Sequence, residues 1–282
     1  MIGFVDFARA SGLDISHVVA NGQIVRCGTT LHPRSKNGAY MFDGKFGWTQ
    51  SWDTDSQVNI YGEKKEFSQS DKTEWLKKKQ AQEQYQSTLN IRAVQKVQTL
   101  IKSSEIKSHD YFIYQHLHNS VGHVTENNEL VIPMFSLTGD LQGAQIITFN
   151  SDIKKFEKKM IYGMKAKGAV HRLGNKNALE TILCEGYATG LSIKLACDMA
   201  RLNIAVLVCF SANNLINIAK ELTGKAYVFA DNDISNVGKT SAEKTGLAYV
   251  MSDVVGDDAN DLHRKSGLIA VLKKVMEVRS KK

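Results

Sequence analysis

The chain has 282 residues, of which 43% are hydrophobic and 23% charged, so its composition is that of a folded globular protein with one large or two ordinary domains. This balance excludes collagen-like, fully disordered and disulfide-scaffold classes. Lysine and arginine outnumber aspartate and glutamate by 36 to 29, and the formal net charge of +7 favours a polyanionic partner without requiring one.

No stretch approaches the roughly 20 consecutive apolar residues of a membrane-spanning helix, and the first ten residues have no basic segment followed by an apolar one. We therefore expect a cytoplasmic protein with no membrane partner. The four cysteines stand far apart without a CxxC pair, so we expect no structural zinc site. Cys184 and Cys209 lie in apolar runs that predict buried strands, which indicates that they are core residues.

Residues 1–62 predict a small β-rich module that follows a short helix at residues 4–10. Two aromatic-rich runs flank Asp43-Gly44, a pair typical of a hairpin turn. Basic and aromatic residues are mixed here, a pattern that suits single-stranded nucleic acid, and Arg34, Lys36 and Trp48 are candidate DNA contacts. The alternative is that these are ordinary loop and surface residues of a packing module. The mixed set is Arg26, His32, Arg34, Lys36, Tyr40, Trp48 and Trp52.

Residues 63–107 are rich in polar helix formers and predict a long exposed helical linker. Its lysines favour a solvated face over a specific nucleic-acid surface. Residues 108–175 predict an α+β subdomain, with strands at 129–135 and 143–149 around the turn Thr138-Gly139-Asp140. A basic stretch follows, with Lys165, Lys167, His171 and Arg172.

Residues 176–282 alternate apolar runs with helical patterns, which predicts an α/β domain with a parallel sheet flanked by helices. Ligands of such sheets gather beyond the carboxyl ends of the strands. The expected strands are residues 181–184, 204–210, 225–230 and 247–252, and the expected helices are residues 189–201, 213–222, 238–246 and 260–278.

Carboxylates follow three of the four expected strands: Glu185 the first, Asp231 and Asp233 the third, and the run Asp257-Asp258-Ala-Asn-Asp261 the fourth. Acids that converge on one edge raise one another's pKa unless a cation lies among them. Magnesium prefers one or two carboxylates together with waters and phosphates, which suits an open edge. The set Glu185, Asp231 and Asp233 therefore predicts a magnesium site, and manganese would suit the same ligands.

The same acids also fit helix capping, with Asp257 or Asp258 before the last helix and Asp233 or Ser235 before residues 238–246. For Asp257 alone, capping is the preferred interpretation. Gly238-Lys239-Thr240 resembles the end of a phosphate-binding P-loop, but Asp233 stands where that motif needs its first glycine. We reject a P-loop and keep Lys239 as a candidate nucleotide contact.

Three motifs in order resemble the TOPRIM domain of primases, topoisomerases and some nucleases. They are Glu180-Thr-Ile-Leu-Cys-Glu185-Gly186-Tyr-Ala-Thr-Gly-Leu-Ser192, Phe229-Ala-Asp231-Asn-Asp233 with Gly238, and Gly256-Asp-Asp258-Ala-Asn-Asp261-Leu262. Within that group the chain is most similar to primases of phages, satellite phages and conjugative plasmids. Weaker similarity extends upstream, so the resemblance covers roughly residues 105–275. The motifs are specific for TOPRIM and much less specific for primer synthesis.

The resemblance implies a TOPRIM-like domain in which Glu185 acts in acid–base chemistry or organises metal, and Asp231 and Asp233 hold magnesium. Asp258 and Asp261 match the third acidic motif, although Asp257 competes for the same role. The resemblance also implies contacts from the basic stretch to template or nucleotide phosphates. The residues expected there are Lys165, Lys167 and Arg172, with His171 either contributing or packing.

The function that follows is a magnesium-dependent DNA primase, which joins ribonucleotides into short RNA primers on single-stranded DNA in phage or plasmid replication. No Walker motif is present, so a helicase or replication-initiation protein would be a separate partner. Two alternatives stay open. One is a TOPRIM-type nuclease, and the other is a non-catalytic nucleic-acid-binding accessory protein of a mobile element. Tyr187, beside Glu185-Gly186, argues little for a topoisomerase, since no separate tyrosine-bearing domain is apparent.

Overall fold

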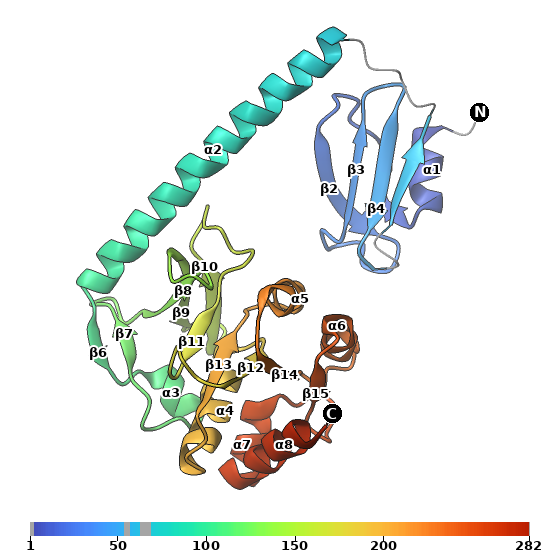
Figure 1. Cartoon of the computed structure of the whole chain (residues 1–282). Coiled ribbons are helices and arrows are strands. Elements are labelled where there is room, and N and C mark those ends of the chain that lie inside the picture. Colours follow the sequence, from blue (N-terminus) through green and yellow to red (C-terminus); the bar gives the residue numbers. More distant parts are fainter. Residues whose placement is uncertain (1–2, 54–56, 63–68, 282) are drawn as a thin grey trace. The chain divides into compact units, whose positions relative to one another are not determined.

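The computed structural model describes residues 3–53, 57–62 and 69–281. The chain divides into two compact units, residues 1–80 and residues 81–282 (Figure 1). The expected fold class is confirmed: an α/β region at the C-terminus follows a mixed α+β region and a small β-rich module. Among the described helices, none combines the length and apolar character needed to cross a membrane.

The first unit is a five-stranded antiparallel sheet with one helix packed on one face. Helix α1 (Phe4–Ala10) precedes β1 (Leu13–Asp14), β2 (Ile24–Thr29), β3 (Gly38–Phe42), β4 (Gly47–Ser51) and β5 (Val58–Tyr61), which pair in chain order. The predicted hairpin at Asp43-Gly44 joins β3 to β4, and the Asp43 carboxylate accepts the amides of Lys45 and Phe46. Phe4 stacks on Phe42 with ring centroids 4.4 Å apart.

The predicted linker helix forms as α2 (Gln69–Lys102), but its last third is not a solvated linker. Ala93 and Val97 are buried and pack against Val131, Ala144 and Ile161. The sequence pattern concealed this contact because only a few apolar residues face the sheet. The last third of the helix therefore packs into the core of the second unit.

An antiparallel sheet follows, with the strand order β10-β9-β8-β7-β6. The predicted strands correspond to β8 (Leu130–Phe135) and β9 (Leu141–Asn150). The sequence analysis did not identify three strands or the short helix between the first two. These are β6 (Glu105–Lys107), α3 (Asp110–Tyr114), β7 (Gly122–Val124) and β10 (Lys155–Met160).

The third sheet has the order β11-β13-β12-β14-β15 and carries the C-terminal α/β region. Four of its strands are parallel: β12 (Glu180–Cys184), β13 (Ile204–Val208), β14 (Lys225–Phe229) and β15 (Ala248–Val250). Helices α4 (Tyr187–Met199), α7 (Ala259–Ser266) and α8 (Leu268–Ser280) cover one face, and α5 (Ala212–Glu221) and α6 (Val237–Thr245) cover the other (Figure 1).

Two expectations for this region need correction. The sheet is not wholly parallel, because β11 (His171–Leu173), expected within the preceding subdomain, joins its edge antiparallel to β13. The single closing helix expected at residues 260–278 is two helices, α7 and α8, separated at Gly267. Gly267 has φ 79°, a conformation that glycine adopts readily and that interrupts a helix.

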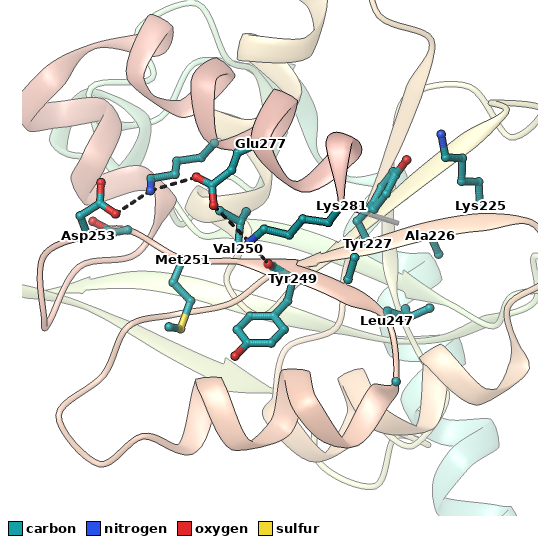
Figure 2. Close-up of a pocket in the computed structure, with 14 residues that line it drawn as sticks. Lys225, Ala226, Tyr227, Leu247, Tyr249, Val250, Met251, Asp253, Glu277 and Lys281 are labelled. Atoms are coloured by element: carbon teal, nitrogen blue, oxygen red, sulfur yellow. Dashed lines mark hydrogen bonds and ion pairs between the residues drawn. The ribbon is translucent and has the colours of Figure 1, made fainter.

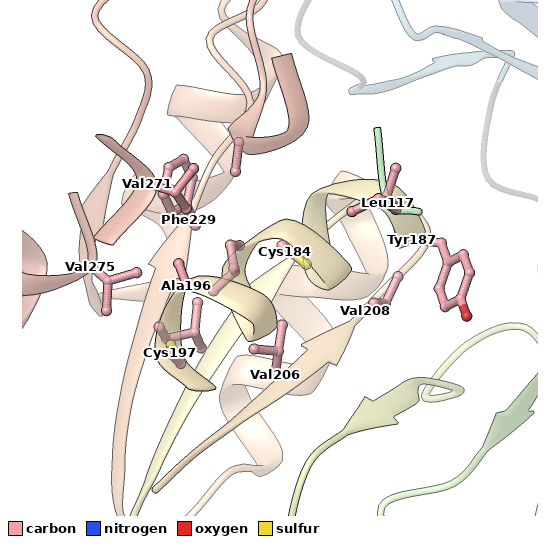
Figure 3. Close-up of a cluster of buried hydrophobic side chains, with 14 of the residues drawn as sticks. Leu117, Cys184, Tyr187, Ala196, Cys197, Val206, Val208, Phe229, Val271 and Val275 are labelled. Atoms are coloured by element: carbon pink, nitrogen blue, oxygen red, sulfur yellow. The ribbon is translucent and has the colours of Figure 1, made fainter. Parts of the chain in front are cut away.

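The main core links the second and third sheets. Tyr111 and Phe112 of α3 belong to the same buried cluster as Ile182, Val206 and Val275 of the C-terminal region. Figure 3 shows part of this cluster around Cys184 and Cys197. Cys184 and Cys209 are core residues as predicted, and both are fully buried. The C-terminal sheet is thus held rigidly against α3, which borders the acidic edge described next.

Candidate functional site

The carboxyl ends of β12, β14 and β15 lie at one edge of the sheet because these three strands run parallel. Glu185 comes directly after β12, and Asp231 comes two residues after β14. Asp258 is the N-cap of α7, the helix that follows β15. The fold therefore brings the three acidic motifs to one edge, as the strand pattern predicts.

Asp231 is an acidic residue of this edge with a buried oxygen that no described residue contacts through a hydrogen bond. Its Oδ1 atom is buried and has no hydrogen-bond partner among the described residues. Burial, together with the negative charges of Asp258, Glu185 and Asp233, raises the pKa of Asp231 to about 7 against the opposing charge of Lys158. A buried oxygen without a donor, surrounded by like charges, is costly unless a proton or a cation binds there.

Glu185 borders the same space. Burial raises the pKa of its carboxyl, the charge of Asp233 raises it further, and a hydrogen bond from the Ala212 amide at the start of α5 opposes both effects. The backbone is fixed as well, since the Glu185 carbonyl accepts the Phe210 amide at 2.9 Å. A carboxyl with a raised pKa and a fixed backbone suits proton transfer near neutral pH.

Asp233 has different surroundings, because its carboxylate accepts hydrogen bonds at the start of α6. The Gly238 amide donates to Oδ2 at 2.7 Å, the Val237 amide donates to Oδ1 at 3.1 Å, and the Ser235 hydroxyl also donates to Oδ1. Against the effect of burial, these donors lower the pKa of Asp233. Asp233 therefore caps the start of α6, which is the role that the sequence analysis kept as an alternative. Both of its carboxylate oxygens already accept hydrogen bonds.

Gly238 allows α6 to approach the Asp231 backbone. A Cβ atom at Gly238 would lie 2.2 Å from the Asp231 carbonyl oxygen, well inside contact distance. Only glycine fits there without a shift of the helix or of the loop. The position of Asp231 is thus tied to the first turn of α6.

The third acidic motif divides into separate roles. Asp258 and Asp261 form a capping box at the start of α7, and the Thr189 hydroxyl donates to Oδ2 of Asp258 at 2.6 Å. Asp257 is 6% exposed and accepts both hydrogen bonds of the Lys265 ammonium, at 2.6 and 2.8 Å. Capping thus falls to Asp258 rather than Asp257, and Asp257 has a cation of its own.

Lys158 of β10 is a basic residue at this edge that the sequence analysis did not single out. Burial lowers the pKa of its ammonium group, and the negative charges of Asp258 and Asp231 oppose that effect. Its Nζ atom lies 5.6 Å from the centre of the Tyr111 ring. The run Lys-Phe-Glu-Lys-Lys gives no signal for this position, which depends on the pairing of β10 with β9.

A pocket of about 210 Å³ opens between Lys158 and the start of α7. Arg264 lines it, with its guanidinium carbon 5.7 Å from the Tyr114 ring centre and one guanidinium nitrogen 3.7 Å from Oδ1 of Asp261. Gly186 contributes backbone to the wall. The complete lining is Tyr114, Gln115, Lys158, Gly186, Ala188, Thr189, Asp258, Asn260, Asp261 and Arg264.

The basic residues predicted ahead of the domain do not join this pocket. Lys165 and Lys167 line a separate pocket of about 300 Å³ with Glu221, the last residue of α5. Glu185 contacts the other end of α5, at Ala212. The assignment of Lys165 and Lys167 as phosphate contacts stays a prediction.

The remaining predicted contacts of this unit are dispersed. His171 Nδ1 donates a hydrogen bond to the Pro133 carbonyl at 2.8 Å, and its ring lies edge-on to Tyr187, which is the packing alternative. Arg172 points to the opposite face of β11, where burial lowers the pKa of its guanidinium. Lys239 lies half-exposed on α6, 4.0 Å from Glu243.

Three predicted contacts lie in the first unit. Arg34 and Lys36 are exposed in the loop between β2 and β3, and Trp48 is half-buried on β4. They are described with that sheet below.

The donor set at the acidic edge fits a divalent ion that is only partly held by protein. Among the described residues, no three His, Cys, Asp or Glu side chains stand close enough together to share one ion. The unpartnered buried oxygen of Asp231, close to Glu185 and Asp258, does fit magnesium bound by one or two carboxylates and completed by water and phosphate. Asp233 and Asp261 would have to release hydrogen bonds to join it.

A larger pocket of about 890 Å³ lies along the edge strand β15 (Figure 2). Its charges are paired with one another: Lys274 contacts Asp253 and Glu277, and the Lys281 ammonium donates to the Tyr249 carbonyl at 2.9 Å. Glu185, Asp231 and Asp258 are not part of its lining. This pocket is therefore separate from the candidate site.

Comparison with protein families matches residues 180–268 to the Toprim domain. The C-terminal region of the chain thus carries a Toprim domain, which is the class that its strand order and acidic edge define. The match includes the acidic residues of the candidate site, from Glu185 to Asp261.

Solved structures similar to the chain include three that contain primase fragments or domains. The primase fragment of the bacteriophage T7 primase-helicase protein is 13% identical over 52% of this chain and 62% of its own length, with a TM-score of 0.37. A second structure contains the bacteriophage T7 lagging-strand DNA polymerase interacting with primase domains of two gp4 subunits bound to an RNA/DNA hybrid and dTTP. Its matching chain is 15% identical to this one. That match covers 53% of this chain and 76% of the other, with a TM-score of 0.36.

The DnaG catalytic core is 16% identical over 64% of this chain and 58% of its own length, with a TM-score of 0.36. The chain thus spans less than two thirds of the T7 primase fragment and of the DnaG core. No curated protein sequence matches the chain.

Proposed function

We propose that this protein is a DNA primase, which joins ribonucleotides into short RNA primers on a single-stranded DNA template. The observation that carries the proposal is the buried Asp231 oxygen, which has no hydrogen-bond partner among the described residues. It lies at the sheet edge where Glu185 and Asp258 also lie. Primase structures similar to this chain support the choice among Toprim activities. A separate helicase or replication-initiation protein is part of the proposal.

Magnesium bound at Asp231 would neutralise phosphate charge and stabilise the attacking and leaving oxygens of nucleotidyl transfer. Glu185, whose pKa is raised, is placed to accept the proton of a 3′-hydroxyl. Lys158 and Arg264 offer ammonium and guanidinium donors to phosphate oxygens at the adjoining pocket. Asp258 and Thr189 keep the loop before α7 in place through their hydrogen bond.

The test is synthesis of short products from labelled ribonucleotides on single-stranded DNA, with magnesium or manganese. Asp231→Asn keeps the size of the side chain and removes its charge, so we expect product formation to fall about 100-fold or more, the rate equivalent of several kcal/mol. Asp253→Asn is the matched control, because Asp253 lies at the same end of the sheet, is 84% exposed and pairs with Lys274. It is expected to retain wild-type synthesis.

Two outcomes would contradict the proposal. Full synthesis by Asp231→Asn would remove Asp231 from the reaction. Degradation of labelled DNA or RNA without added nucleotides, with no synthesis by wild-type protein, would identify a nuclease that uses the same acidic edge.

A further inference from the structure

One face of the N-terminal sheet is covered by α1, and no described element of the first unit covers the other. The covered face holds Tyr40 and Phe42, which pack against Phe4. Because side chains alternate along a strand, the residues between them point the other way. The open face is defined here as Ile24, Arg26, Ala39, Met41, Trp48, Gln50, Val58 and Ile60, with Trp52 at its margin.

The strand register aligns the open face into two rows. Ile24 pairs with Met41, Met41 with Trp48, and Trp48 with Ile60, so four apolar side chains cross four strands over roughly 14 Å. The second row runs Arg26, Ala39, Gln50 and Val58. Ile24 is 66% exposed, Val58 53% and Ile60 54%, and no described element of the first unit covers them. A contiguous set of exposed apolar side chains is typical of an interaction surface.

One margin of the open face is basic. The Arg26 guanidinium lies 4.0 Å from the centre of the Trp52 ring and donates to the Lys36 carbonyl, which brings the Lys36 backbone beside it. Arg34 is exposed in the same loop. No residue of the open face is acidic.

Asp53, a carboxylate next to Trp52 at this margin, is already engaged. It accepts hydrogen bonds from the Thr29 hydroxyl and from Asn37 Nδ2, the latter at 2.8 Å, and its Oδ2 lies 3.0 Å from His32 Nδ1. These contacts leave the His32 side chain 62% exposed with its second ring nitrogen free of Asp53. The margin therefore presents hydrogen-bond donors and positive charge to an approaching ligand.

We propose that the open face binds single-stranded nucleic acid, with Trp48 and its aliphatic neighbours contacting bases and the Arg26–Lys36 margin contacting phosphates. Aromatic and apolar side chains on a sheet stack with unpaired bases of any sequence, and a basic border follows the backbone. The charge of the margin selects a polyanion over an apolar protein partner. The proposal rests on the first unit alone and does not require that the Toprim domain synthesise primers.

The experiment uses the full chain, because all three tryptophans, Trp48, Trp52 and Trp75, lie within residues 1–80. Tryptophan emission therefore reports on the first unit, and anisotropy of a labelled oligothymidylate of about 12 nucleotides reports on total binding. We expect the oligonucleotide to quench the emission at the concentrations at which anisotropy rises. Binding without any change in emission would overturn the proposal.

Substitutions on the open face make the test specific. Trp48→Ala is expected to weaken binding about tenfold, the equivalent of one lost stacked base. Trp48→Phe keeps a stacking ring and is expected to stay within about threefold of wild type. Equal affinity of Trp48→Ala and wild type would contradict the contact, and thermal unfolding of each variant shows whether the sheet remains folded.

A matched pair of charge substitutions separates a local contact from general electrostatics. Ile60→Asp and Leu179→Asp each place one negative charge at an exposed aliphatic site, and Leu179, 81% exposed, precedes β12 in the other unit. Only Ile60→Asp is expected to weaken binding by about tenfold. Equal losses would overturn the proposal. So would sedimentation that shows self-association abolished by Ile60→Asp with oligonucleotide affinity unchanged, because the face would then bind a second copy.

The two proposals fail separately. Absence of synthesis by the wild-type protein with tryptophan quenching intact would remove the primase proposal and leave the open face as a nucleic-acid site. Synthesis by the wild-type protein with no quenching would remove the open face and leave the primase proposal standing.

Discussion

Asp231 and Asp257 lie on neighbouring loops at the same end of the C-terminal sheet, and both bury carboxylate oxygens. Asp257 receives two hydrogen bonds from Lys265, whereas Asp231 has a buried oxygen with no partner among the described residues and a pKa raised to about 7. The loops are joined, because the Asn232 amide donates to the Asp257 carbonyl at 3.2 Å. Two buried carboxylates on joined loops therefore differ in whether a cation donates hydrogen bonds to them, and the one without such a donor is the candidate for a ligand or metal.

The same contrast holds between the two pockets of the Toprim domain. In the pocket along β15, the charges of Asp253, Lys274 and Glu277 satisfy one another. In the smaller pocket beside α7, Arg264 lies 3.7 Å from Asp261, whereas the Lys158 ammonium, which interacts with the charges of Asp258 and Asp231, has no ion pair among the described residues. The smaller pocket is the one with charge available for a ligand.

The largest stability effect is expected at the close approach behind Asp231. Gly238→Ala places a Cβ atom against the Asp231 carbonyl, and overpacking of this kind costs about 1 to 3 kcal/mol of unfolding free energy. Denaturant unfolding measures this loss. Gly3→Ala is the control, since the nearest atom to its Cβ is 3.7 Å away, and a loss at Gly238 no larger than at Gly3 would disprove the tight packing.

A smaller effect is expected where Asp257 loses its cation. Lys265→Met leaves the carboxylate buried without its two hydrogen bonds, and the unfolding free energy should fall by about 1 to 2 kcal/mol. Lys274→Met is the matched control in the β15 pocket. Its partners, Asp253 and Glu277, are 84% and 44% exposed and can return to water, so its loss should stay below about 1 kcal/mol. Equal losses would contradict the distinction between the buried Asp257 carboxylate and the exposed partners of Lys274.

The smallest effect is the pH dependence of the metal-free protein. The folded-state pKa of Asp231, about 7, lies above the unfolded value, so the folded state holds a proton that the unfolded state has lost between about pH 4 and 7. Asp231 therefore makes the unfolding free energy fall as the pH rises through this window. Unfolding in chelator should show a flatter profile for Asp231→Asn, and identical profiles would mean that Asp231 titrates normally.

The acidic edge was predictable because each acid follows a strand of a parallel sheet, which places it from the chain order alone. The break at Gly267 also had a signal: Arg264 and Lys265 near a helix end, followed by glycine, are typical of a stop. Lys158 had none, because its position depends on the register of β10 with β9 and on packing against Tyr111. The sequence could not show that Asp257 has a lysine donor and that one oxygen of Asp231 has none among the described residues, because both depend on how the loops fold.

The most direct test of the account is the binding of Mn²⁺ to the full chain, measured by calorimetry or by the loss of its free-ion paramagnetic resonance signal. The account predicts that Asp231→Asn weakens binding about tenfold or more, and that Asp257→Asn, which removes a carboxylate already held by Lys265, leaves binding unchanged. Wild-type affinity in Asp231→Asn together with weakened binding in Asp257→Asn would contradict it.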